Sequence, residues 1–163
     1  MRTSTAGINL IRLSEKFVSK PYLCPAGIPT IGYGTTIYPN GKKVTLKDKP
    51  ITKAEAIKML EFMVDTVYEE YVDKYVKVPL TQGQYDAIVD FVYNMGGGAL
   101  QSSTLLKKLN AKDYHGAWLE LDKWVMAKNP RTGKKAPLRG LQIRRDMEQA
   151  LWNTLPQPVR DES

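Results

Sequence analysis

The sequence predicts an α+β protein that is mostly α-helical. Helical periodicity runs through most of the chain after residue 50, and only residues 28–44 show the β-branched and aromatic residues punctuated by glycine that are typical of short strands. A chain of 163 residues with 42% hydrophobic and 25% charged residues can bury about two thirds of its unfolded surface. We therefore expect one soluble folded domain.

A short helix is predicted over about residues 5–16, where apolar side chains recur near the helical period. The helix should end before a turn that contains Pro21, which leaves Glu15 at its C-terminal end. Within residues 28–44, Pro39-Asn40-Gly41 is a turn signal between Thr-Ile-Tyr and Lys-Lys-Val-Thr. This segment predicts a small hairpin or three-stranded sheet.

A long helix is predicted over about residues 52–76, because Thr52 and Glu55 form a capping-box signature and an apolar stripe follows them. Its length suits a connector between two lobes. The same signature at residues 81–84 begins a second helix, which three consecutive glycines at residues 96–98 should end.

The remainder of the chain is expected to form shorter helices near residues 103–109 and 113–122, then a basic loop and a last helix. The basic loop, residues 128–137, contains two prolines and one glycine, and its charges could help to hold an anionic polymer. The last helix should cover about residues 138–152, and residues 156–163 should form a frayed tail. The residues of the last helix expected to point inward are Leu141, Met147, Leu151 and Trp152.

The net charge of +7 and the pI near 9.4 favour polyanionic partners such as nucleic acid, anionic membranes or cell-wall polymers. The single cysteine and single histidine, Cys24 and His115, cannot supply a structural disulfide or the nitrogen and sulfur ligands that zinc usually requires. We expect no metal and no other cofactor. No signal peptide or membrane-spanning run is recognisable, so synthesis in a reducing cytosol is expected.

Residues 15–36 contain the main candidates for chemistry, because a helix end, a Pro-Gly loop and a Gly-rich hairpin meet there. Each signal is weak by itself. Glu15 fits an ordinary solvated helix end, Cys24 fits a small buried apolar residue, and Thr30 fits a strand residue. A glutamic acid at a cleft wall can, however, stay protonated near neutral pH when it is desolvated.

The joint spacing of these residues is more specific. Glu15 and Cys24 are nine positions apart, and Cys24 and Thr30 are six apart. With the segment Thr30-Ile31-Gly32-Tyr33-Gly34, they resemble the active-site signature of the phage-type lysozymes, family 24 of the glycoside hydrolases. Further blocks resemble the family in the family's order: Phe91-Val92-Tyr93-Asn94-Met95-Gly96, then Ser103-Thr104-Leu105-Leu106, then Arg139-Gly140-Leu141 with Arg144-Arg145 and Glu148.

The resemblance implies a lysozyme-like fold in a single catalytic domain, residues 1–163, without a separate cell-wall-binding domain. A small β lobe would cover about residues 15–50, and a larger helical lobe would comprise about residues 1–14 and 77–155. The helix at about residues 52–76 would join the lobes, with the active-site cleft between them.

The resemblance also implies roles for individual side chains. Glu15 would protonate the leaving oxygen of a glycosidic bond, while Cys24 and Thr30 would position the attacking water, giving hydrolysis with inversion. Arg139 would reach back to Glu15 and support the acid. The implied substrate-binding residues are Thr36, Tyr93, Asn94 and Thr104.

Two positions depart from the family pattern. Thr35 stands where the family commonly has a histidine, so a tie from that histidine to a carboxylate is missing. Cys24 is a variant of a position that is otherwise aspartate. A cysteine with an ordinary pKa of about 8.5 is mostly protonated at neutral pH, so Cys24 is a base only if its surroundings lower its pKa.

The function implied by the resemblance is that of a phage endolysin. Such a muramidase hydrolyses the β-1,4 bond between N-acetylmuramic acid and N-acetylglucosamine in peptidoglycan and so lyses the bacterial host. We expect a monomer that binds peptidoglycan glycan strands, does not bind nucleic acid and does not insert stably into membranes. It would accumulate in the host cytoplasm and need a holin to reach the periplasm and the cell wall.

Three alternatives remain open at this point. A lytic transglycosylase would cleave the same bond. A wall peptidase or amidase would use Cys24 as nucleophile and His115 as base, although Cys24 precedes Pro25 in a loop and does not begin a helix. A non-enzymatic basic module would bind nucleic acid, although the lysines and arginines are scattered along the chain.

Overall fold

The computed structural model describes residues 1–129 and 131–154. The predicted frayed tail, residues 156–163, and Pro130 of the basic loop lie outside the described residues. The helices are α1 (Thr5–Glu15), α2 (Lys53–Met63), α3 (Glu69–Tyr75), α4 (Gln82–Met95), α5 (Gly97–Ser102), α6 (Thr104–Asn110), α7 (Tyr114–Glu120) and α8 (Arg139–Trp152). The strands are β1 (Val18–Leu23), β2 (Pro29–Gly32), β3 (Met126–Lys128) and β4 (Lys135–Pro137).

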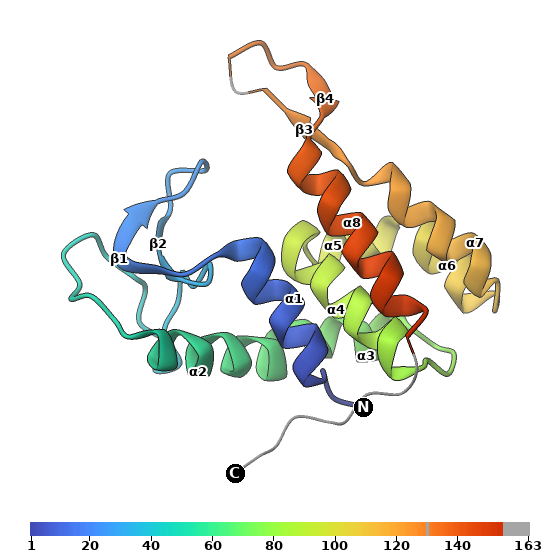
Figure 1. Ribbon diagram of the computed structural model, residues 1–163, viewed down its shortest axis with the longest axis horizontal. Helices are drawn as coiled ribbons and strands as arrows, with labels where there is room; N and C mark the ends of the chain where they lie inside the picture. Colours follow the sequence, from blue (N-terminus) through green and yellow to red (C-terminus); the bar gives the residue numbers. More distant parts are fainter. Residues whose placement is uncertain (130, 155–163) are drawn as a thin grey trace.

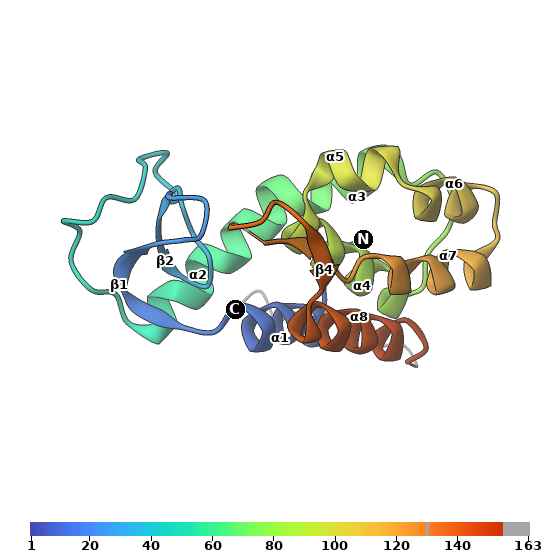
Figure 2. The same ribbon diagram turned by 90° about the horizontal axis from the view of Figure 1, so that it is seen from above.

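The described residues form a small β-containing lobe and a larger helical lobe. Figures 1 and 2 show β1 and β2 at one end of the molecule, the helices α4 to α8 at the other, and α2 running from the first toward the second. Helix α1 lies on the helical side and packs against α4 and α8. The predicted class, α+β with mostly helix, is confirmed.

Helix α1 and the β lobe follow the sequence pattern with one correction. Helix α1 ends at Glu15 as predicted, but β1 begins at Val18 and contains Pro21, which was expected in a turn. The pairing of β1 with β2 is irregular between Val18 and Tyr22, and each strand of a two-stranded sheet has an open edge. Proline has no backbone N–H to donate, and such a strand accommodates it.

The predicted turn at Pro39-Asn40-Gly41 is confirmed. Ile37 and Lys43 form an antiparallel bridge across it, and the Gly41 N–H donates to the Tyr38 carbonyl at 2.9 Å. Gly41 has φ +86°, a backbone conformation that side chains disfavour. The second half of the predicted sheet is therefore a bridged turn, whereas the regular pairing is that of β1 with β2.

The predicted connector helix is continuous but not uniform. The capping box of Thr52 and Glu55 begins α2 as expected, and α3 ends at Tyr75. Between them, Val64–Tyr68 forms a π-helical segment (η1). Within it, the Thr66 hydroxyl donates to the Phe62 carbonyl at 2.7 Å, a side-chain bond that competes with the regular helical ladder. No sequence pattern indicated this widened turn.

The core of the helical lobe surrounds α4. Its fully buried apolar residues include Ala87, Ile88, Val89, Phe91 and Val92, so this helix is covered on most sides. Gly96, with φ +95°, ends α4 as predicted, but α5 then begins at Gly97, where no helix was expected. The other predicted helices correspond to α6, α7 and α8.

The predicted inner face of α8 is partly wrong. Leu151 and Trp152 are buried as expected, but Leu141 and Met147 are only half-buried. The middle of the inner face is polar instead: Arg144, Arg145, Glu148 and Gln149. Gln149 donates to the Trp118 carbonyl of α7 at 3.0 Å, whereas Arg144 faces α4 and pairs with its fully buried Asp90. A buried charge requires a partner of this kind.

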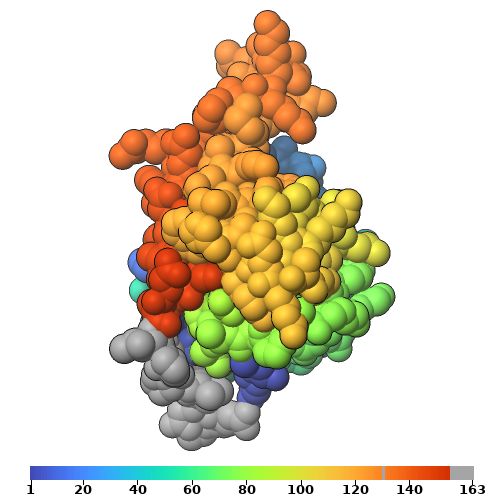
Figure 3. Space-filling model, turned by 90° about the vertical axis from the view of Figure 1, so that its right-hand side faces the viewer, coloured from blue at the N-terminus to red at the C-terminus, as the bar shows by residue number. Residues whose placement is uncertain are grey.

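The predicted basic loop is a β-hairpin. Strands β3 and β4 pair from Met126 with Pro137 to Lys128 with Lys135, and Gly133 in the turn has φ +68°. Figure 3 shows this segment projecting beyond the helical body. Within the part of the chain that the structure describes, no helix is both long enough and apolar enough to cross a bilayer.

Candidate active site

Glu15 lies where α1 leaves the helical lobe and the chain enters β1. The next residue, Lys16, has φ 60°, so the chain turns sharply after the glutamate. The Lys16 N–H donates to the Arg12 carbonyl at 3.0 Å and closes the helix end. The Glu15 side chain is 25% exposed, which leaves it accessible to a ligand while most of it is desolvated.

Arg144 from α8 holds Glu15 in place. Its Nη1 donates to Glu15 Oε1 at 2.8 Å, while its Nε and Nη2 donate to the two carboxylate oxygens of Asp90 at 3.0 and 2.8 Å. Burial lowers the pKa of Arg144, but the hydrogen bonds and charges of Asp90 and Glu15 outweigh it and raise that pKa above its usual value. Arg144 is thus a permanent cation shared by two carboxylates.

The prediction that Arg139 supports Glu15 is wrong. Arg139 is the first residue of α8, is exposed and makes no ion pair with any described residue. Arg144 lies five residues further along the helix, on the face that packs against α4. Helical phase therefore decided which arginine reaches the site.

Glycine and aromatic side chains surround the free oxygen of Glu15. Gly34 has φ +83°, and a Cβ built on it would lie 3.3 Å from Glu15 Oε2 and 3.4 Å from the Tyr93 hydroxyl. The Tyr93 hydroxyl donates to the Tyr33 carbonyl, and its ring packs 4.6 Å from that of Tyr68. Burial, and then the charge of Glu15, raise the pKa of both Tyr68 and Tyr93, so these phenols stay neutral beside the acid.

Cys24 and Thr30 lie together at the end of the β1–β2 pair. The Cys24 N–H donates to the Ile28 carbonyl at 3.1 Å, and the Thr30 hydroxyl donates to the same carbonyl at 2.8 Å. A hydrogen bond from the Ile28 backbone, opposed by desolvation and aided by the Ala26 backbone and the Thr30 hydroxyl, lowers the pKa of the Cys24 thiol. The Thr30 hydroxyl can donate its hydrogen bond either to the Ile28 carbonyl or to the Cys24 thiolate.

The four predicted substrate-binding residues do not share one environment. Thr36 is half-buried in the β lobe, and its carbonyl accepts from Val44 N–H at 2.9 Å. Tyr93 lies beside Glu15, as described above, with its hydroxyl engaged by Tyr33. Thr104 is exposed at the start of α6 and borders a hollow of about 390 Å³ with Met95, Trp124 and Lys135.

Asn94 has a structural partner that the sequence did not indicate. Its Oδ1 accepts a hydrogen bond from Arg145 Nη2 at 2.7 Å, so its carbonyl is directed toward α8. Arg145 also donates to the Trp124 carbonyl at 3.3 Å and to Glu148 Oε1 at 2.8 Å. Asn94 therefore belongs to the buried network between α4 and α8.

Thr35, which replaces the family's histidine, is buried at 3% exposure, and its Oγ1 has no hydrogen-bond partner among the described residues. Its backbone N–H and carbonyl pair with Ile31 at 2.9 Å on both sides. The hydroxyl thus supplies no link between the lobes, in agreement with the missing tie expected from the sequence.

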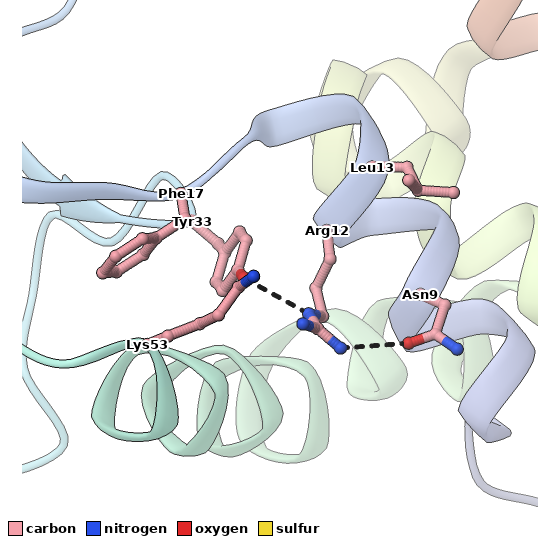
Figure 4. A pocket seen from close by; sticks show the side chains of 6 residues that line it. All are labelled: Asn9, Arg12, Leu13, Phe17, Tyr33 and Lys53. Carbon is pink, nitrogen blue, oxygen red and sulfur yellow. Dashed lines mark hydrogen bonds between the residues drawn. The ribbon is translucent and has the colours of Figure 1, made fainter.

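A separate pocket lies between α1 and α2, with a volume of about 380 Å³ (Figure 4). Arg12 donates from Nε to the Tyr33 hydroxyl at 3.3 Å and from Nη1 to Asn9 Oδ1 at 3.3 Å. The lining contains the cations Arg12 and Lys53 and no carboxylate. It offers no acid for hydrolysis, but its Tyr33 also accepts the Tyr93 hydrogen bond through its carbonyl.

The pairing of Cys24 with His115 in a peptidase is wrong. His115 is on α7 and stacks on Trp118 with ring centroids 5.7 Å apart, whereas Cys24 follows β1. Figure 1 shows these elements at opposite ends of the molecule. Among residues 1–129 and 131–154, no group of three or more His, Cys, Asp and Glu side chains is arranged to hold a metal ion.

The comparisons with known proteins agree with this geometry. The model of the phage lysozyme family matches residues 12–148, which span Glu15 to Glu148. The chain belongs to the phage lysozyme family. It is 42% identical over 155 residues to an endolysin of Acyrthosiphon pisum secondary endosymbiont phage 1, covering 94% of this chain and 99% of that protein.

Two further relatives extend the comparison. The SAR-endolysin of Escherichia phage Mu is 38% identical over 145 residues, covering 89% of this chain and 77% of that protein. The solved structure of an endolysin from Escherichia coli O157:H7 phage FAHEc1 superimposes with a TM-score of 0.85 at 34% identity, covering 97% of this chain and 98% of that one. The lysozyme-like fold and the enzyme class, a lysozyme of the phage endolysin type, are thereby confirmed, and the family disfavours a purely binding module.

Sequence reasoning missed Asp90, Tyr68 and Gly34 as neighbours of the acid. Asp90 carried a usable signal, because a carboxylate inside the apolar run Ala-Ile-Val-Asp-Phe-Val must find a partner when the helix is buried. Tyr68 lay outside the expected apolar stripe of the connector helix and gave no such signal. The role of Gly34 depends on its distance to Glu15, which requires the folded chain.

Proposed function

We propose that Glu15 is the general acid of a muramidase reaction on peptidoglycan. The observation that carries this proposal is the one-sided anchoring of Glu15: Oε1 is fixed by Arg144, whereas Oε2 faces Gly34 and Tyr93. Asp90 takes the other two hydrogen bonds of Arg144 and neutralises much of its charge. Glu15 can therefore release a proton to the leaving oxygen without losing its position.

The second half of the reaction is assigned to Cys24 and Thr30. A thiol whose pKa is lowered by the Ile28 backbone carries more thiolate near neutral pH than free cysteine does, so it can accept a proton from water. Thr30, buried at 3% exposure, directs its hydroxyl toward the same turn and can orient that water. Attack by a positioned water gives hydrolysis with inversion.

The proposed substrate is the glycan strand of peptidoglycan, lying between the lobes so that the scissile bond meets Glu15. Thr36 from the β lobe and Tyr93 and Thr104 from the helical lobe are the proposed contacts, while Asn94 would act through its bond to Arg145. The whole chain would serve as one catalytic domain. Names printed for the relatives, endolysin and SAR-endolysin, support lysis of a bacterial host as the setting.

The finer biological setting is also a proposal. A monomer would accumulate in the host cytoplasm and reach the wall through a holin. The exposed basic hairpin, with Lys128, Lys134 and Lys135, would aid binding to the anionic wall without nucleic-acid binding or stable membrane insertion.

Purified peptidoglycan tests the catalytic assignment. Wild type, Glu15→Gln and Cys24→Ala are incubated with it, and the soluble fragments are identified by mass spectrometry. Glu70→Gln, an exposed glutamate of α3, is the control. Fragments with reducing N-acetylmuramic acid ends should appear with wild type and Glu70→Gln and be absent with Glu15→Gln.

Other products would contradict the proposal in different ways. Anhydro ends would identify a lytic transglycosylase. Freed peptides would identify a peptidase or amidase. Full activity of Glu15→Gln would remove Glu15 from the acid role.

A further inference from the structure

The interface of α4 and α8 contains an unusual excess of carboxyl groups. Two guanidinium groups, of Arg144 and Arg145, face three carboxyl groups, of Glu15, Asp90 and Glu148. Asp90, Arg145 and Glu148 have side chains with 0% exposure. Once Glu15 has released its proton, the cluster with all of these groups ionised would carry a net charge of −1, which is costly in a desolvated site.

The hydrogen bonds identify which of the three carboxyl groups has an oxygen without a donor. Both oxygens of Asp90 accept from Arg144, so this carboxyl group is paired with a guanidinium. Glu148 Oε1 accepts from Arg145 Nη2 at 2.8 Å, but Glu148 Oε2 is buried and has no donor among the described residues. Among the described residues, Asp90 is the carboxyl group that acts on Glu148 through a hydrogen bond. Two carboxylates cannot hydrogen-bond each other unless one of them carries a proton.

We propose that Glu148 is a positioning residue for Glu15. Its neutral carboxyl donates a hydrogen bond from Oε2 to Asp90, and this bond keeps Asp90, Arg144 and Glu15 in their relative positions. The proposal rests on the role proposed above for Glu15. Glu148 is linked to Glu15 through a series of contacts: Glu148 with Asp90, Asp90 with Arg144, and Arg144 with Glu15.

The charges around Glu148 agree with a neutral carboxyl. Burial, and then the hydrogen bond and charge of Asp90, raise the pKa of Glu148 well above its usual value. Arg145 and Arg144, the cations that face it, lower that pKa by less. Asp90 lies on α4, and both arginines lie on α8.

The proposed proton affects both geometry and charge. A proton donor on Glu148 gives Asp90 a second partner besides Arg144, and the Asp90 carboxylate in turn orients the guanidinium so that its Nη1 points at Glu15. An ionised Glu148 would repel Asp90 and draw Arg144 toward the core. Glu15 would then lose its anchor although Glu148 never touches substrate.

The raised pKa also has a consequence for stability. The stabilisation from this proton is fully present below the ordinary glutamate pKa of about 4.3 and is lost as pH rises through the higher folded-state pKa. Glutamine at this position cannot ionise. Glu148→Gln should therefore lose this part of the decline of stability toward alkaline pH, a change that a purely space-filling side chain would not produce.

Two substitutions test the role. In Glu148→Gln, Nε2 can still donate to Asp90 and Oε1 can still accept from Arg145, so kcat on soluble peptidoglycan oligosaccharides should stay within about threefold of wild type. Glu148→Leu keeps the volume but neither bond, and its kcat should fall at least about tenfold with KM changed less than about twofold. Asp146→Asn, on the exposed face of α8, is the control and should match wild type.

A direct measurement of the proton keeps the proposal falsifiable even if Glu148→Leu does not fold. Carboxyl carbon-13 NMR of wild type at pH 7 should show a protonated glutamic acid signal that is absent in Glu148→Gln and remains in Glu15→Gln. An ionised Glu148, or equal kcat loss in the Gln and Leu variants, would overturn the proposal. So would wild-type kcat in Glu148→Leu.

The same set separates this proposal from the one for Glu15. Loss of activity in Glu15→Gln together with full activity in Glu148→Leu would contradict only the positioning role of Glu148. Full activity in Glu15→Gln would sink the acid assignment, and the positioning role would then fall with it even if the NMR signal is present.

Discussion

Arg144 Nη1 lies 2.8 Å from Glu15 Oε1, and these two residues are 129 positions apart in the chain. The bond joins the end of the first helix to the middle of the last one, and Asp90 on α4 completes it through a two-pronged contact with the same guanidinium. The candidate acid is therefore positioned by the helical lobe, although it lies at the entrance to the β lobe. Arg144 is the cation that Glu15 and Asp90 share.

Replacing Arg144 should lower both stability and activity, whereas replacing Arg139 should change neither. Arg144→Gln leaves Asp90 buried without its cation, so we expect a loss of about 3–5 kcal/mol in the free energy of unfolding. Activity at a temperature where the variant is folded should fall at least about tenfold, because Glu15 loses its anchor. Arg139→Gln should change neither by a measurable amount. Denaturant unfolding and hydrolysis of peptidoglycan check both, and equal effects of the two variants would contradict the structure.

Gly34→Ala should impair activity more than stability. The φ of +83° makes any side chain there cost about 1–2 kcal/mol, and the new Cβ would displace Glu15 Oε2. Gly41 is a matched control, because its φ is +86° but nothing lies within 4 Å of a built Cβ. Both alanine variants should lose similar stability in thermal unfolding, while only Gly34→Ala should lose about tenfold in kcat. Unchanged kcat in Gly34→Ala would mean that Glu15 tolerates the displacement.

The lowered pKa of Cys24 predicts the direction of a pH effect. The Ile28 backbone bond favours the thiolate, so the thiolate persists to lower pH than in free cysteine and disappears as pH falls through the lowered pKa. Because Cys24 is the single cysteine, the rate of alkylation by iodoacetamide reports this ionisation directly.

Activity should follow the same ionisation if Cys24 is the base. Cys24→Asp should keep its activity to lower pH than wild type, since a carboxyl has an ordinary pKa of about 3.9. Cys24→Ser should be slower than both near neutral pH. Equal rates for wild type, Ser and Asp variants across the pH range would remove any proton-accepting role for the thiol.

The basic hairpin should matter for binding to the wall and not for the chemical step. The triple substitution of Lys128, Lys134 and Lys135 by glutamine should slow lysis of whole walls by about threefold at low salt, and the difference should vanish near 1 M salt, where the Debye length is about 3 Å. A control triple substitution of the exposed Lys58, Lys77 and Lys107 removes the same charge elsewhere. A turbidity assay on whole walls reports binding and cleavage together, whereas an assay on soluble oligosaccharides reports the chemical step. Equal slowing of lysis by both triple variants would mean that only the net charge of the protein matters, not the position of the hairpin.

The sequence by itself determined the order of the helices, the caps at Thr52 and Thr81, and the spacing of Glu15, Cys24 and Thr30. These features are local: a cap, a helical period or a motif depends on residues a few positions apart. The same locality explains why the N-terminal segment, with its Gly-Tyr-Gly turn, indicated the family before the fold was known.

Only the tertiary structure decided which charges meet. Arg139 and Arg144 are equally basic in sequence, and the packing of α8 on α4 turned Arg144 inward and left Arg139 in solvent. The polar inner face of α8 contradicted an assignment based on hydrophobicity, because Asp90 was buried opposite it. Burial makes an unpaired charge costly, so partners from distant segments must converge, and that convergence is not encoded in any local pattern.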